Sequence, residues 1–243
     1  MRFTSLQKKH KLRVVEDCAH AIGASYKGKR IGSFGDIQVM SFHPNKNMTT
    51  GEGGCVITDD KDIIGAMERL RFHGIDRNAF NRFVKSGSQD YDVVLPGFKY
   101  NMMDMQAALG IHQLPELDGF INKRAVLVKR YYEAFADWPE FILPKAPPYE
   151  HVHAWHLFTT RLTTGNRDEF ISAMKAENIG IGLHYQSAHI FSWHKERYGW
   201  EPQDFPHALD AGNRIVSLPL FPTMTDAEQA RVIKTLEKML GKS

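Results

Sequence analysis

Short apolar runs alternate with polar connections through the first third of the chain. Runs over residues 12–15, 37–42 and 55–58 have the length of strands, and the first is followed at once by the charged pair Glu16-Asp17. An apolar run that ends in charge is typical of a strand buried in a parallel sheet. Helical spacing follows the third run, so the pattern predicts an α/β arrangement in this part of the chain.

A long amphipathic helix is predicted near the middle of the chain. Asn101, followed three residues later by Asp104, has the spacing of a helix cap, and Pro115 suits the first turn of the next helix. Residues 76–99 show no clear period and predict a long surface loop before the cap. Beyond Pro115 apolar residues recur at spacings of three and four over roughly six turns. They are Leu117, Ile121, Ala125, Val128, Tyr132 and Phe135.

The proline-rich stretch at residues 138–148 ends this helix region, and a different pattern follows. Residues 155–162 predict a strand, Asn166 with Glu169 predicts the start of a helix, and Thr225 begins a capping box for the last helix. The predicted division is an α/β part at residues 1–114, a linking helix with the proline-rich connection at 115–149, and a smaller α+β part at 150–243.

Composition excludes several classes of protein. With 42% hydrophobic and 24% charged residues among 243, the chain is neither disordered nor fibrous. Its net charge of +3 is spread along the chain and forms no basic block, which argues against a nucleic-acid partner. No apolar run approaches the roughly 20 residues of a membrane span, and the charged N-terminus lacks the apolar core of a secretory signal. Cys18 and Cys55 match no disulfide or zinc spacing. We therefore expect a soluble cytoplasmic protein.

The densest polar cluster follows the second predicted strand, at residues 41–46, and contains Lys46. A single lysine is usually a surface charge. Asp17 and His20, however, follow the preceding strand, and we expect both strands to end at the same edge of the sheet. Lysine, aspartate and histidine at one edge suit a cofactor that forms an imine with lysine and needs a carboxylate beside a pyridinium nitrogen. The spacing alone suggests this chemistry and does not decide it.

Two other groups of residues have simpler explanations. His151, His153 and His156 could indicate a metal site, but on a strand the first two share a face and the third points the other way. Packing or substrate contact is the better interpretation, and no metal is predicted. The glycines between residues 28 and 35 lack the strand–GxGxxG–helix context of a phosphate loop, so turns explain them.

Nine segments together carry a specific resemblance that covers nearly all of the chain. They are VEDCAHAIG at 15–23, GSFGD at 32–36, SFHPNKNMTTGEGG at 41–54, RFHG at 71–74, YNMMD at 100–104, QAALG at 106–110, HVHAWHLF at 151–158, GIGLHYQSAH at 180–189 and SLPLFP at 217–222. In these segments the chain resembles the DegT/DnrJ-type nucleotide-sugar aminotransferases, which depend on pyridoxal phosphate (PLP). The implied fold is that of a fold-type I PLP-dependent transferase, with part of the large α/β domain followed by a smaller C-terminal α+β domain.

The resemblance also implies roles for individual residues. Lys46 is implied to bond to the cofactor, Asp17 to pair with its pyridine nitrogen, His20 to lie by its ring and Ser41 to reach its phosphate. Asn101 is implied to contact the phosphate in a neighbouring subunit's site, which predicts a homodimer with shared active sites. Substrate contacts are implied for three histidines of the C-terminal part, His153, His184 and His189.

The implied reaction transfers the amino group of glutamate, leaving 2-oxoglutarate, to a keto-sugar nucleotide. The segments at 151–158 and 180–189 resemble most the enzymes that aminate a UDP-linked 4-keto sugar in lipid A modification, the UDP-4-amino-4-deoxy-L-arabinose–oxoglutarate aminotransferases.

The resemblance departs from the family at the N-terminus. Family members are longer there, and the resemblance implies that the extra portion holds the segment that binds the cofactor phosphate. We therefore expect the chain to be a truncated, C-terminal portion of such an enzyme. The alternative is a non-catalytic remnant that only dimerises or binds a partner. A weaker alternative is a generic nucleotide-binding α/β domain.

Overall fold

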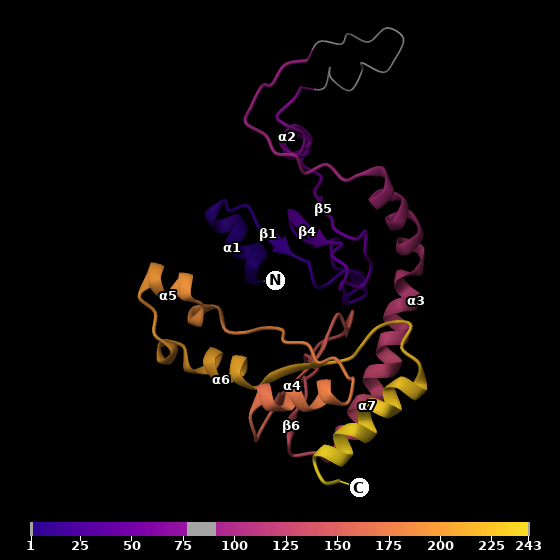
Figure 1. Cartoon of the computed structure of the whole chain (residues 1–243). Coiled ribbons are helices and arrows are strands. Elements are labelled where there is room, and N and C mark those ends of the chain that lie inside the picture. Colours follow the sequence, from indigo (N-terminus) through magenta and orange to yellow (C-terminus); the bar gives the residue numbers. More distant parts are fainter. Residues whose placement is uncertain (1, 77–90, 243) are drawn as a thin grey trace. The chain divides into compact units, whose positions relative to one another are not determined.

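The computed structural model describes residues 2–76 and 91–242 and divides the chain into two compact units (Figure 1). Unit 1 runs from Met1 to Leu117, and unit 2 runs from Asp118 to Ser243. Each unit contains a small sheet of its own. Over the described ranges, no helix combines the length and the hydrophobicity needed to cross a membrane.

Unit 1 is built around a three-stranded sheet in the order β1–β4–β5. β1 runs parallel to β4, with Asp17 opposite Val39, and β5 runs antiparallel to β4, with Cys55 opposite Met40. The elements are α1 (Arg2–His10), β1 (Val15–Asp17), β2 (Ser25–Tyr26), β3 (Lys29–Arg30), β4 (Ile37–Ser41), β5 (Gly54–Ile57), α2 (Lys61–Leu70) and the first part of α3 (Asp104–Phe135). The prediction that two neighbouring strands end at one edge is confirmed by the parallel β1–β4 pair.

The first strand begins later than the apolar pattern predicts. Lys11 adopts a left-handed backbone conformation with φ +51°, and the Leu12 N–H donates to the Gln7 carbonyl at 3.0 Å. Leu12, the first residue of the apolar run, therefore belongs to the turn that ends α1, and β1 starts only at Val15. Arg13 forms ion pairs with Asp36 and Asp60.

The glycine-rich connection before β4 contains a tight hairpin. β2 and β3 pair as antiparallel strands, with Tyr26 opposite Lys29. Both loop residues, Lys27 at φ +48° and Gly28 at φ +74°, are left-handed, as a two-residue type I′ turn requires. The prediction that turns explain the glycine at 28 is confirmed. The predicted surface loop at 76–99 lies largely outside the described residues, which leave out 77–90.

α3 is one continuous helix from Asp104 to Phe135, so the prediction that a new helix begins at Pro115 is wrong. Proline in a helix lacks the N–H that would have bonded to the carbonyl of Ile111, and its ring crowds that same carbonyl. Ile111 and Pro115 are both exposed, so water can satisfy the released carbonyl. The helical pattern on both sides of Pro115 then outweighs the local cost of proline.

Unit 2 packs helices against a three-stranded antiparallel sheet in the order β6–β8–β9. The elements after α3 are β6 (Phe141–Ile142), β7 (His151–Val152), β8 (Phe158–Leu162), α4 (Arg167–Ala176), η2 (Ala188–Ile190), α5 (Ser192–Tyr198), η3 (Pro202–Asp204), α6 (Pro206–Arg214), β9 (Ile215–Leu218) and α7 (Asp226–Met239). Two of the three predicted caps are confirmed: Asn166 accepts from the N–H groups of Asp168 and Glu169, and Thr225 forms a capping box with Glu228. The predicted cap at Asn101 is wrong, because α3 begins only at Asp104 and Asn101 accepts from Lys99.

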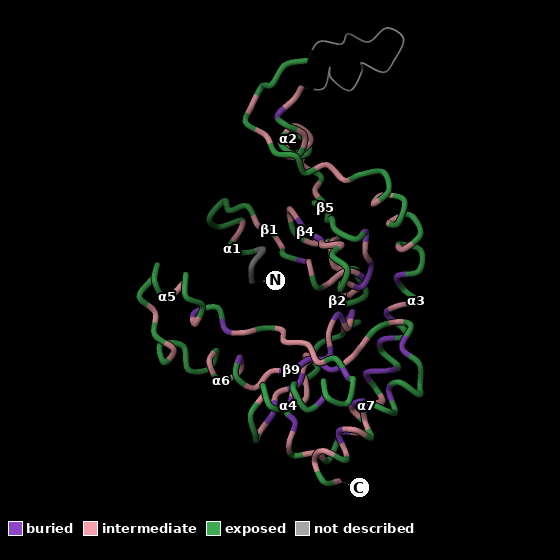
Figure 2. The backbone as a smooth tube through the Cα atoms, in the orientation of Figure 1, coloured by how far each residue is buried: buried purple, intermediate pink, exposed green. Residues whose placement is uncertain are grey.

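The core of unit 2 gathers along the second half of α3, as the buried segments in Figure 2 show. Tyr131, Phe158 and Leu236 are fully buried, and the Tyr131 hydroxyl donates to the Pro219 carbonyl at 2.9 Å. The predicted apolar stripe of α3 is wrong at one position. Ala125 is exposed, and Arg124 lies in the buried stripe instead.

Candidate active site

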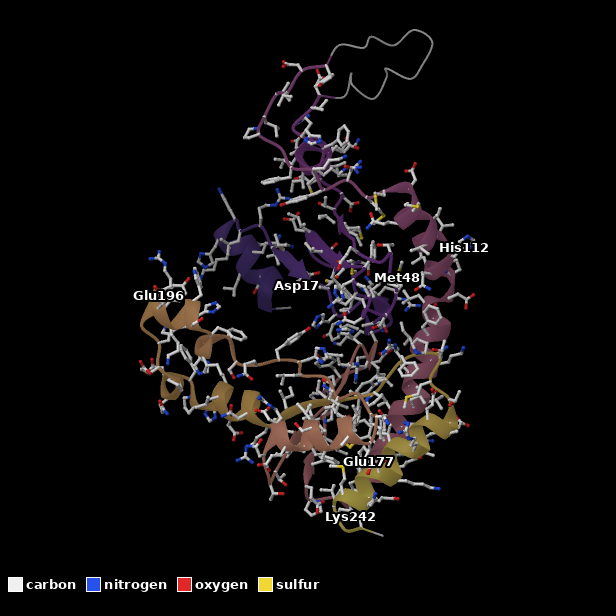
Figure 3. All side chains as sticks on the ribbon, in the orientation of Figure 1. Asp17, Met48, His112, Glu177, Glu196 and Lys242 are labelled. Atoms are coloured by element: carbon white, nitrogen blue, oxygen red, sulfur yellow. The ribbon has the colours of Figure 1, made fainter. Side chains whose placement is uncertain are left out.

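The first predicted site residue, Asp17, closes β1 at the carboxyl end of the parallel pair (Figure 3). The Cys18 N–H donates to the Val39 carbonyl at 2.9 Å, so the ladder to β4 continues one residue past Asp17. The Asp17 Oδ1 atom accepts a hydrogen bond of 3.0 Å from the Ala19 N–H. The Asp17 side chain is exposed, and this bond holds the carboxylate in place while leaving its other oxygen accessible.

Lys46 lies in a closed loop that follows β4. The loop is closed at its base because the Phe42 carbonyl accepts from the Thr50 N–H and from the Thr49 hydroxyl, both at 3.0 Å. Within the loop, the Lys46 N–H donates to the His43 carbonyl at 3.0 Å. Asn47, the residue after the lysine, is buried, so the loop is anchored in the interior next to Lys46.

The charge state of Lys46 is shifted by its surroundings. Burial of the half-buried amine lowers its pKa from the ordinary value of 10.5, and the negative charge of Asp17 raises it by a smaller amount. The net direction is downward. Two consequences follow: the two side chains are close enough to interact electrostatically, and more of the Lys46 amine is neutral near pH 8 than for an exposed lysine. A neutral amine is the form that attacks carbonyl groups.

The TTGEGG turn at 49–54 braces this loop against the start of α3. The Gln113 Oε1 atom accepts from the Thr49 N–H at 3.3 Å, and the Gln106 amide donates to the Glu52 carbonyl at 2.9 Å. Glycine is required at 54, because a Cβ there would stand 2.6 Å from the Met40 carbonyl oxygen. The turn thus has a structural role, next to the strand that leads to Lys46.

The other residues predicted in unit 1 take separate positions. Ser41 ends β4, is half-buried, and its hydroxyl oxygen accepts from the His43 N–H at 3.3 Å. His20 lies in the turn after β1 and is exposed. Asn101 is half-buried ahead of α3 and accepts a hydrogen bond from Lys99. The structure therefore brings Asp17, Ser41 and Lys46 to neighbouring strand ends and holds Asn101 in a different segment.

The three histidines predicted to contact substrate differ in accessibility. His153 is exposed, and its Nδ1 atom accepts from the Trp155 N–H at 2.8 Å. His184 is half-buried, with Nδ1 at 2.8 Å from the Ser217 hydroxyl. His189 is only 5% exposed, and its Nε2 lies 3.0 Å from the Pro202 carbonyl. These contacts of His189 are those of a core histidine, so we leave it out of the proposed substrate site. Among the described residues, no cluster of side chains suits a metal ion.

A family model, described as the DegT/DnrJ/EryC1/StrS aminotransferase family, matches residues 2–237. The chain belongs to this family. Two curated relatives are 39% identical to this DegT/DnrJ/EryC1/StrS chain: the uncharacterized protein MJ1066 of Methanocaldococcus jannaschii, over 98% of the chain, and the spore coat polysaccharide biosynthesis protein SpsC of Bacillus subtilis, over 97%. The chain spans 62% of the length of each.

A solved structure of the same fold is Spr1654 of Streptococcus pneumoniae, a protein assigned as a sugar aminotransferase and solved in its PMP-form. It superimposes with a TM-score of 0.85 at 29% identity, over 98% of this chain and 61% of Spr1654. A PLP-form of the same protein matches with a TM-score of 0.84. The α/β fold type predicted from the sequence is thereby confirmed.

Proposed function

We propose that this chain carries the lysine-bearing part of a PLP-dependent sugar aminotransferase, which moves the amino group of glutamate to a keto-sugar nucleotide. The observation that carries the proposal is the electrostatic interaction of Lys46 with Asp17 beside the carboxyl ends of neighbouring parallel strands. Membership of the aminotransferase family and the likeness to a sugar aminotransferase solved with PLP support it.

The residues at this edge have the chemistry that PLP needs. Lys46 supplies a half-buried amine with a lowered pKa, Asp17 supplies a carboxylate, and Ser41 supplies a hydroxyl. We propose that Lys46 bonds to the cofactor aldehyde, Asp17 keeps the pyridine nitrogen protonated, and Ser41 donates to the phosphate. His20 is proposed to lie by the ring. When bound, PLP supplies a positively charged ring that takes up electrons released at the amino-bearing carbon.

The two charged residues then have distinct tasks. With glutamate held at the cofactor, the free Lys46 amine would lie beside the amino-bearing carbon of the donor. Its lowered pKa suits it to take the proton from that carbon and to return it elsewhere, because efficient proton transfer needs a pKa near the working pH. The Asp17 carboxylate would stabilise the positive charge on the ring nitrogen.

The finer proposal concerns the acceptor. The segments that contain His153 and His184 resemble those of enzymes that aminate a UDP-linked 4-keto sugar, so we propose that class as the acceptor, in the synthesis of cell-envelope sugars such as those of lipid A. A polysaccharide role is in keeping with the name of SpsC, which acts in spore coat polysaccharide biosynthesis.

We also propose that the chain acts as a homodimer with shared sites, in which Asn101 serves the partner's cofactor. Support comes from the first turns of α3. Met105 and Ile111 there are 74% and 70% exposed, and they lie on different sides of the helix. A helix that is apolar on several sides is typically covered by other protein.

The lysine assignment is tested by trapping. The chain is mixed with PLP over a range of concentrations near pH 8 and reduced with borohydride, which converts an imine into a stable pyridoxyl adduct. We expect one fast-forming adduct, mapped by peptide mass spectrometry to Lys46. Lys46→Ala should lose it, since Lys46 combines a lowered pKa with the nearby charge of Asp17.

Lys123→Ala is the matched control, because Lys123 is exposed on α3. It should leave the fast adduct unchanged. A fast adduct that persists in folded Lys46→Ala protein would refute the assignment. A wild-type chain that forms no selective adduct at any PLP concentration would favour the alternative of a non-catalytic binding module.

A further inference from the structure

Arg124 is a buried cation on α3 with an unusual set of partners. It is 4% exposed, and its Nη1 lies 2.9 Å from the Leu220 carbonyl, 3.2 Å from the Trp155 carbonyl and 3.3 Å from the His156 carbonyl. Its Nε has no hydrogen-bond partner within the described residues, and no described carboxylate pairs with it. One guanidinium thus ties together two segments that are far apart in sequence.

Burying this charge is costly, because no opposite charge compensates it. Burial lowers the pKa of Arg124 to about 10. An apolar side chain of similar size would fill the same place without that cost. The feature that favours arginine at this position is therefore its hydrogen bonds to carbonyl groups. Two of those carbonyl groups belong to the turn at 155–156.

That turn is strained and needs an outside restraint. Trp155 adopts φ +46°, a left-handed conformation that costs a bulky residue about 1–3 kcal/mol. Both backbone polar groups of Trp155 are held. Its carbonyl accepts from Arg124, and its N–H donates to His153 Nδ1 at 2.8 Å. The rings of His153 and Trp155 also pack together, with centroids 4.1 Å apart.

The bond from the Trp155 N–H determines where the His153 proton resides. A nitrogen that accepts a hydrogen bond carries no proton, so a neutral His153 must hold its proton on Nε2. Partial desolvation of the ring and the nearby His151 both lower the pKa of His153, which favours the neutral form. The exposed side chain then presents an Nε2–H donor to an acceptor oxygen of a ligand.

We propose that Arg124 is a positioning residue: by clamping the 155–156 turn, it holds His153 in the Nε2–H tautomer that donates to the sugar-nucleotide substrate. The link to substrate rests on the proposed function. The link between Arg124 and the tautomer rests only on the geometry within unit 2.

The tautomer is measured by NMR of the 15N-histidine-labelled full chain at pH 8, with His153→Gln to assign the signals. We expect the Nε2–H form to dominate in the wild-type chain. Arg124→Met, which keeps the volume but removes the donors, should give a mixture of both tautomers. Arg130→Met is the matched control on the same helix, where Arg130 pairs with Asp226 at the surface. It should leave the tautomer unchanged.

Three results would overturn the proposal: an Nδ1–H tautomer in the wild-type chain, an unchanged tautomer in folded Arg124→Met protein, or a mixture in the Arg130→Met control. Should Arg124→Met fail to fold, the tautomer is measured in Arg124→Gln instead. The shorter amide side chain can donate to a carbonyl of one segment but cannot bridge both segments. The substrate link is tested separately: His153→Gln in an active, completed enzyme should raise KM for the sugar nucleotide. An unchanged KM would refute the contact and leave the tautomer result standing.

Discussion

Asp17 and Lys46 influence each other through charge before any ligand binds. Burial lowers the pKa of Lys46, and the Asp17 carboxylate partly reverses that effect. Asp17→Asn keeps the size of the side chain and removes its charge. The favourable interaction with the ammonium form is lost, so we expect the pKa of Lys46 to fall further below 10.5 than in the wild-type chain.

The measurement is the pH dependence of Lys46 modification by a small acylating reagent, followed by mass spectrometry. The inflection should lie below that of exposed lysines in the wild type, and lower again in Asp17→Asn. Glu16→Gln is the control, because neighbouring residues of a strand point to opposite faces. An inflection that moves upward in Asp17→Asn would contradict the interaction on which the proposed site depends.

Sequence patterns place Asp17 and Lys46 near each other because Asp17 ends β1, Lys46 follows β4, and parallel neighbours end at the same edge. The predicted burial of the first strand is wrong, since Val15 and Asp17 are exposed. Sequence patterns do not separate an accessible histidine from a core histidine. His153 and His189 lie in equally suggestive segments, yet one is exposed and the other packs against Phe205 with its Nε2 against the Pro202 carbonyl. That difference depends on tertiary packing. The sequence does contain a signal for the buried position of Arg124, because this cation interrupts a row of apolar residues at helical spacing.

Element boundaries were least predictable where two local preferences compete. Asn166 and Thr225 predict their helix starts correctly, because a cap is a local hydrogen bond between close neighbours. Pro115 predicts a helix start that does not exist, because the surrounding turns continue the helix through it. α5 and α6 were not predicted: α5 is seven residues long, neither has a side-chain cap, and their signals are limited to Gly199 after α5 and Pro206 at the start of α6.

Pro115 is therefore expected to hold α3 below its attainable stability. Pro115→Ala restores one backbone hydrogen bond and relieves a helix-interior cost of about 3 kcal/mol, against about 1 kcal/mol lost because the unfolded chain becomes more flexible. We expect the free energy of unfolding to rise by about 2 kcal/mol, measured by urea denaturation followed by circular dichroism. Glu116→Ala, an exposed neighbour on the same helix, should change it by less than about 0.5 kcal/mol. A less stable Pro115→Ala protein would mean that the proline fits a local bend in α3.

Unit 1 taken as a whole leaves apolar side chains exposed. Val15 on β1 is 61% exposed, and a cavity of about 640 Å³ is lined mostly by apolar side chains from β4, β5, α2 and residues 98–100. The chain spans 62% of the length of SpsC, so that relative has further chain outside the match. The resemblance implies that this further chain includes the segment that binds the cofactor phosphate.

These observations give a prediction for the 243-residue chain by itself. Two or three charge-assisted hydrogen bonds to the phosphate, at about 1.5–3 kcal/mol each, are worth several orders of magnitude in affinity. Without them we expect PLP to bind weakly in a spectroscopic titration, with little transamination.

Adding the further chain of SpsC, fused or as a separate polypeptide, should restore tight binding, amino transfer from glutamate and the mass of a dimer in sedimentation. Lys46→Ala in the completed protein should keep the dimer and lose the transfer, which separates assembly from chemistry. A panel of keto-sugar nucleotides then tests the acceptor: preference for a dTDP-linked or 3-keto sugar would refute the UDP-4-keto proposal and leave the aminotransferase proposal intact. Tight, stoichiometric PLP binding and turnover by the 243-residue chain alone would show that its own residues already hold the phosphate.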